Sequence, residues 1–207
     1  MKKKSVAVLL AVLLVVGVVI GGTMAWLTST SAPVENVFTA GDVDITLTEE
    51  AGGENKEFQM IPGWTIKKDP KVTVDTKSED CLVFVKLEKS GGNITLDGTT
   101  YNFDSFLSYA IADGWTQLVD ASDETVEGVY HRTVLKGDFS REFSVIAGDT
   151  VNVNPDVTKA MMNELERDGT KRPKLTVTAY AIQLNKDNNT PFAAWEAWAN
   201  VPKTTNA

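Results

Sequence analysis

Cys81–Lys89 reads CLVFVKLEK and is apolar on both alternating faces at its start. Successive side chains of a β-strand point to opposite faces, so Leu82 and Phe84 would face away from Cys81 and its odd-numbered neighbours. Apolar residues on both faces indicate a strand that is covered on both sides. We therefore predict that this stretch forms the central strand of the fold.

Further strands are predicted on either side of this run, from alternating or apolar segments bounded by turn residues. In Asp42–Glu49, every second residue from Val43 to Leu47 is apolar, which indicates a half-buried strand. The other predicted strands are Lys71–Asp75, Trp115–Val119, Gly128–Leu135, Arg141–Ile146, Val151–Asn154 and Lys174–Leu184. Asp97-Gly98 predicts a tight hairpin between the apolar residues on its two sides.

Three short helices are predicted in the connections. The first is Asp104–Ala112, with Asp104 as its N-cap, and the second is Pro155–Arg167, whose apolar residues recur at helical spacing. The third would follow Thr190-Pro191. Many short strands separated by turns favour an antiparallel β-sandwich over alternating βαβ units. The prediction is one mostly β domain, residues 41–207.

The charge balance of the chain is strongly acidic. The formal net charge is −8, and without residues 1–25 it becomes −11, from 17 basic and 28 acidic residues. Such a surface argues against binding to nucleic acid or to anionic membranes. With Cys81 as its single cysteine, the chain cannot form an internal disulfide, so its core alone must hold it together. We expect Cys81 to be a small buried apolar residue.

The N-terminus has the organisation of a secretory signal peptide. Three lysines precede an apolar run, Val6–Ile20, and small residues follow it. We predict a signal helix in residues 1–25, with cleavage after Ala25, Thr23 as the other small residue of the site, and Trp26 as the new N-terminus. The alternative is an uncleaved anchor, because Val6–Ala25 is just long enough to span a membrane if it is tilted.

Gly21–Glu49, GGTMAWLTSTSAPVENVFTAGDVDITLTE, resembles the start of the TasA/camelysin family of Gram-positive bacteria. The residues that fall on the family pattern after the signal peptide are Asn36, Phe38, Ala40, Gly41 and Asp44. The segment IPGWTIKKDPKVTV is similar to a Pro-Gly turn and strand of the family, with Pro62 and Gly63 at the turn. KLTVTAYAIQL followed by PFAAWEAW is similar to its closing strand and Trp-bearing segment.

The resemblance implies a secreted structural protein of the extracellular matrix or cell surface, with a jelly-roll order of strands. It implies processing by a SipW-type signal peptidase, contact with the membrane only through the signal segment before cleavage, and self-assembly into a fibre. The mechanism implied is donor-strand exchange, in which an extended arm, residues 26–40, completes the sandwich of the next subunit. The candidate donor residues are Leu27, Val34, Val37 and Phe38.

Motifs for catalysis are missing from the sequence. A zinc peptidase of the HExxH type needs two histidines one helical turn apart, and His131 is the only histidine. No GxSxG motif or phosphate loop occurs. The carboxylates of Asp120–Glu124 could hold calcium, but a solvated acidic turn is the favoured interpretation. We predict a non-enzymatic protein without a cofactor.

Two other functions stay open at this point. The first is a monomeric surface adhesin or accessory binding module that uses the region of Trp195 and Trp198. Those residues are otherwise expected to form a hydrophobic lid on the core. The second is a camelysin-like peptidase, which the single histidine disfavours.

Overall fold

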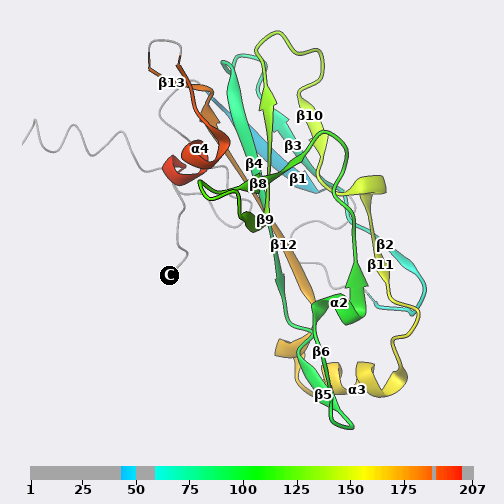
Figure 1. Cartoon of the computed structure of the whole chain (residues 1–207). Helices are drawn as coiled ribbons and strands as arrows, with labels where there is room; N and C mark the ends of the chain where they lie inside the picture. Colours follow the sequence, from blue (N-terminus) through cyan, green and yellow to red (C-terminus); the bar gives the residue numbers. More distant parts are fainter. Residues whose placement is uncertain (1–42, 50–58, 188–189, 202–207) are drawn as a thin grey trace, which may run out of the picture. The chain divides into compact units, whose positions relative to one another are not determined.

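The computed structural model describes residues 43–49, 59–187 and 190–201 (Figure 1). Strands are the predominant secondary structure of these residues, and every strand pair among them is antiparallel. The predicted mostly β, antiparallel fold class is therefore confirmed. The jelly-roll order stays a prediction, and the signal helix and the boundaries at residues 25 and 40 lie outside the described residues.

The largest sheet has four strands, in the order β12, β4, β9, β8 (Figure 1). Their bounds are Lys174–Gln183, Cys81–Ser90, Thr125–Val134 and Thr116–Val119. The apolar run Cys81–Lys89 thus lies in β4, which pairs with β12 on one edge and with β9 on the other. This confirms the prediction of a central strand.

Two smaller sheets have three strands each. One has the order β1 (Ile45–Glu49), β3 (Pro70–Val74), β10 (Glu142–Ser144), and the other has the order β2 (Thr65–Lys67), β11 (Thr150–Val153), β7 (Leu107–Ser108). Two short hairpins complete the strands: β5 (Ile94–Leu96) with β6 (Thr99–Tyr101), and β13 (Asn185–Asp187) with β14 (Thr190–Pro191). The predicted Asp97-Gly98 turn joins β5 to β6, with a positive φ at both residues.

The core has two parts, one on each face of the four-stranded sheet. On one face, Cys81, Val83 and Val85 of β4 join a large cluster with apolar residues of the two three-stranded sheets. On the other face, Leu82 and Phe84 belong to a smaller cluster with residues of α4 (Ala194–Asn200). Layers on both faces of β4 are consistent with the predicted sandwich, and they explain why its first five residues are all buried.

The first predicted helix is wrong in both length and cap. The helix α2 covers only Phe103–Phe106, with Asn102 rather than Asp104 as its N-cap. Leu107 then takes an extended conformation and pairs with Val153 in the neighbouring strand. Pairing with β11 therefore ends the helix that the apolar spacing of the sequence suggested.

The other two helix predictions are correct in place but wrong in their starts. The helix α3 covers Lys159–Arg167, and the hydroxyl of Thr158 accepts the N–H of Met161 as its cap, so Pro155 precedes the helix. Thr190–Pro191 forms β14 instead of a cap, and α4 begins at Ala194. Two 3₁₀ turns, η1 (Ala147–Asp149) and η2 (Gly169–Lys171), complete the elements.

Candidate functional site

Most of the residues predicted to carry the function lie outside the described residues. These are the cleavage residues Thr23, Ala25 and Trp26, the donor candidates Leu27, Val34, Val37 and Phe38, and the motif residues Asn36, Ala40 and Gly41. The structure describes Asp44, Pro62 and Gly63. The candidate site is therefore built from these three residues and from the strands and loops that they contact.

Pro62 and Gly63 form a tight turn before β2. The N–H of Trp64 donates to the carbonyl of Ile61 at 3.0 Å, and Gly63 has φ +77°, the pattern of a type II turn with proline at its second position. The N–H of Val153 then donates to the carbonyl of Trp64 at 2.8 Å. This turn therefore sets the register between β2 and β11.

Asp44 lies just before β1 and is fixed through its backbone. Its N–H donates to Ser78 Oγ at 2.9 Å, and its carbonyl accepts the N–H of Asp75 at 2.8 Å. Its side chain is exposed. The position thus aligns β1 with β3 and with the loop that follows β3.

One edge of β1 is open within the described residues. Asp44 bonds to the β3 side, and the two sides alternate along an antiparallel strand. The backbones of Ile45, Leu47 and Glu49 therefore face outward, and no described strand pairs with that edge. The side chains of Ile45 and Leu47 still point into the core. β1 also lies next to β12, the edge strand of the four-stranded sheet (Figure 1).

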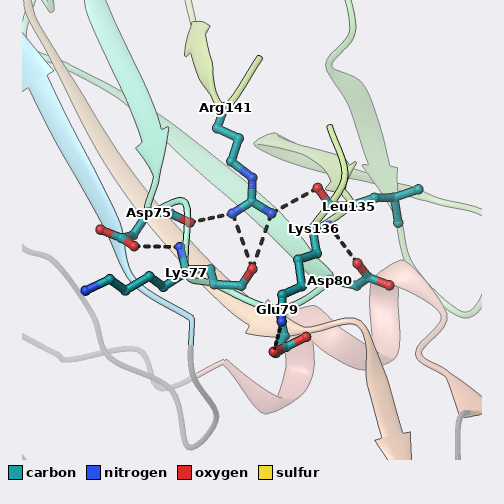
Figure 2. Close-up of polar contacts among 8 residues, drawn as sticks. Asp75, Lys77, Glu79, Asp80, Leu135, Lys136 and Arg141 are labelled. Atoms are coloured by element: carbon teal, nitrogen blue, oxygen red, sulfur yellow. Dashed lines mark hydrogen bonds and ion pairs between the residues drawn. The ribbon is translucent and has the colours of Figure 1, made fainter. Parts of the chain in front are cut away.

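Arg141 joins the loops that follow β3 and β9, as Figure 2 shows. Its guanidinium donates to the carbonyls of Asp75 and Ser78 in the loop after β3, and to that of Leu135 at 2.9 Å in the loop after β9. The side chain is 8% exposed. A buried cation surrounded by carbonyl oxygens keeps its charge satisfied while it fixes the shape of both loops.

Further polar contacts hold the same two loops together (Figure 2). The N–H of Lys136 donates to Asp80 Oδ1 at 2.7 Å, and Lys136 Nζ lies 2.5 Å from Glu79 Oε1. The N–H of Leu135 donates to Asp138 Oδ2 at 2.8 Å. No motif in the sequence indicates this cluster, because the main partners of Arg141 are backbone carbonyls, which any residue provides.

Burial shifts the pKa values of both Cys81 and His131. Cys81 is buried, and burial raises the pKa of its thiol to about 11, against a smaller opposing effect of the positive charge on Arg141. This confirms the expected buried residue, because a reactive cysteine needs a lowered pKa. Burial lowers the pKa of His131, whose ring centroid lies 6.0 Å from that of Phe84.

The acidic loop Asp120–Glu124 closes on itself. Asp120 Oδ1 accepts the N–H of Ser122 at 2.7 Å and the N–H of Glu124 at 3.1 Å, so this carboxylate stabilises the turn. Within residues 43–49, 59–187 and 190–201, no three His, Cys, Asp or Glu side chains are grouped to hold a metal ion. The loop thus has the structure of a turn, which was the favoured interpretation.

The two tryptophans of α4 have different surroundings. The ring of Trp198 packs between Phe84 and Tyr180, with centroids 5.4 Å away in both cases. Trp195 is 44% exposed. Trp198 is therefore part of the predicted hydrophobic lid, and Trp195 is the more exposed of the two.

A scan of protein-family models and searches of curated proteins and of solved structures found no match to this chain. In the described part of the chain, no helix combines the length and the apolar character that a membrane span requires.

Proposed function

We propose that this protein is a secreted structural subunit of the extracellular matrix or cell surface, which assembles into fibres by N-terminal donor-strand exchange. The observation that supports the proposal most directly is the edge of β1 with which no described strand pairs, where the backbone groups of Ile45, Leu47 and Glu49 face outward. A resemblance of residues 21–49 to the TasA/camelysin family supports it from the sequence.

An open strand edge favours the addition of another strand. Its unpaired N–H and C=O groups can bond to an extended segment, and alternate side chains of that segment can enter the core. Here β1 already points Ile45 and Leu47 into the large core cluster, so a strand added beside it would extend the same apolar layer. The arm with Leu27, Val34, Val37 and Phe38 supplies apolar residues for this purpose.

Cleavage after Ala25 would control assembly. Until a SipW-type signal peptidase frees Trp26, the arm is tied to the membrane and cannot reach another subunit. After cleavage, each subunit donates one arm and accepts one, and a head-to-tail contact that does not close produces a filament.

The test follows the size of the processed chain, residues 26–207, against concentration and time, by light scattering and negative-stain microscopy. Filaments should grow from this chain and disappear when residues 26–38 are deleted. A double substitution, Val34→Asp with Phe38→Asp, should also prevent growth, because a buried carboxylate without a partner is costly.

The matched control is Ser29→Asp with Ser31→Asp, which adds the same charge to polar positions of the same arm. This control should still form filaments. Filaments from the deleted chain, or equal loss of growth in both double variants, would contradict donor-strand exchange through these apolar residues.

A monomeric surface adhesin is the second candidate, and the exposure of Trp195 favours it. In this case the size would not depend on concentration, and Trp195→Ala would remove binding to the ligand surface without loss of folding. Trp198→Ala does not test this function by itself, because Trp198 packs against the core and its loss would also destabilise the fold.

A further inference from the structure

Arg132 of β9 stacks on aromatic rings from two different elements. Its guanidinium carbon lies 3.6 Å from the ring centroid of Phe143 in β10 and 5.3 Å from that of Trp115, just before β8. All three side chains are half-buried. Stacking of this kind fixes the plane of an arginine and shields its faces from water.

The surroundings of Arg132 are themselves held in place. Trp115 Nε1–H donates to the carbonyl of Ser144 at 2.8 Å, which ties this ring to the strand that carries Phe143. A Cβ added at Gly114 would lie 3.0 Å from Arg132 Nη2, so the glycine leaves room for the guanidinium. The side chain therefore occupies a preformed position.

The donors of this guanidinium have no protein acceptor. Across the described ranges, Arg132 makes no hydrogen bond or ion pair, and its Nε is buried without a partner. Burial also lowers the pKa of Arg132. Arg141 also has a buried Nε without a partner, but its Nη atoms donate to three carbonyls, and Arg167 Nη1 lies 2.8 Å from Glu164 Oε2.

We propose that Arg132, with Trp115 and Phe143, forms a binding site for a carboxylate group. A planar guanidinium with free Nη donors matches the two oxygens of a carboxylate in a paired geometry. Arg132 supplies the positive charge of the site, and the negative charge of Asp138 acts on it. A monoanion therefore fits better than a phosphate dianion, which would need further cations. This proposal does not depend on fibre assembly.

The test is an NMR titration of the full chain in a nonionic detergent, which brings no anion of its own, with sodium acetate as the probe. We follow the Nε–H signal of Arg132, assigned by its absence from Arg132→Lys, and the indole N–H of Trp115. Both should shift and saturate with acetate, and neither should shift with acetamide. Arg132→Met should remove the saturable shift of Trp115, and Arg132→Lys should weaken binding about tenfold, the loss of one charge-assisted bond.

Arg167 is the internal control, because it is exposed and already paired. Shifts that rise linearly with acetate and are equal at Arg132 and Arg167 would overturn the proposal, as would a saturable Trp115 shift that persists in Arg132→Met. If Arg132→Met does not fold, the comparison of acetate with acetamide on the unsubstituted chain still decides the question.

Polyglutamate distinguishes two sources of the carboxylate. If the ligand is an acidic side chain of a polypeptide, polyglutamate should displace acetate from the site. It should do so at a total carboxylate concentration at which acetate alone does not saturate the site. If the ligand is a free small acid, acetate alone should saturate the site. Failure of both probes would show that Arg132 only covers the core.

Discussion

At the scale of single residues, Arg141 is a charged side chain that is buried among backbone carbonyls. Three backbone carbonyls from two loops share its guanidinium as their donor, and the side chain is almost fully buried. The loops on either side contain mainly polar residues, which cannot bury apolar surface to stabilise themselves. Their shape therefore depends largely on this cation, together with the contacts of Lys136 to Glu79 and Asp80.

Replacing Arg141 with Met should lower the free energy of unfolding by about 2–4 kcal/mol, because buried carbonyls lose their donor. Urea denaturation measures the change. Arg167→Met is the control, since its exposed pair with Glu164 contributes about 0–1 kcal/mol. Equal effects of the two substitutions would show that the loops do not depend on Arg141.

Cys81 gives the stability a specific dependence on pH. Burial raises its pKa from 9.0 to about 11, so the unfolded chain loses this proton at a lower pH than the folded chain does. The contribution of Cys81 to the free energy of unfolding is fully present below pH 9 and is lost as the pH rises to about 11. Between these values, the free energy of unfolding should fall more steeply in the unsubstituted chain than in Cys81→Ala. Parallel curves would contradict the raised pKa.

Residue patterns predicted burial better than they predicted polar partners. The apolar residues on both faces of Cys81–Lys89 identified both buried faces of β4. A strand that is apolar on both faces is stable only where both faces are covered. The Arg141 cluster and the stacked Arg132 were not predicted. Their partners are carbonyls and rings brought from distant segments, and no local spacing in the sequence records such contacts.

At the scale of elements, β9 contains an irregularity that the sequence did not indicate. The strand was predicted to start at Gly128 but starts at Thr125, and its register with β8 shifts between Gln117 and Val119. Gly128 has φ +68°, and a Cβ there would lie 2.3 Å from the carbonyl oxygen of Leu87. Glycine is therefore required where β9 passes close to β4.

Gly128→Ala should lower the free energy of unfolding by about 2–4 kcal/mol, through a positive φ and a clash with backbone. Thermal and urea denaturation measure the loss. Gly137→Ala is the matched control, since no atom lies within 4 Å of its added Cβ. If both variants are equally stable, β9 must be able to adjust at this position.

The helix α4 covers the second face of the four-stranded sheet, and its two tryptophans allow a comparison within one element. Trp198→Ala should destabilise the protein by about 2–4 kcal/mol, because it removes packing against Phe84 and Tyr180. Trp195→Ala should change stability by less than about 1 kcal/mol, since the side chain is 44% exposed. Similar losses from both would mean that the helix is stabilised by something other than the ring of Trp198.

Helices were predicted less well than strands, for a physical reason visible at their ends. The apolar spacing in Asp104–Ala112 is compatible with a helix. Instead, Leu107 pairs with Val153, so its backbone hydrogen bonds are made in a β-sheet. For α3, the hydroxyl of Thr158 provides the first cap, beyond the proline that was expected to start the helix. Competition between local caps and distant strands cannot be read from one segment alone.

At the scale of the whole molecule, the proposed assembly depends on processing at the N-terminus. We expect N-terminal sequencing of the protein collected from the culture medium to begin at Trp26. Ala25→Glu should block cleavage, because small residues are needed before the cut, and should leave the chain bound to the cell. Recovery of an intact Met1 in the medium would contradict the predicted signal peptide.

The pairing of β4 also has a consequence for biosynthesis. Cys81 pairs with Gln183, so the strand that closes one side of β4 is made 102 residues after it. At about 5–20 residues per second, the ribosome takes roughly 5–20 s to cover this interval. During that time the apolar run of β4 has an open edge and can pair with the same run in another nascent chain. A chaperone that covers residues 81–87 until the last quarter of the chain has been translated should therefore raise the yield of correctly folded protein.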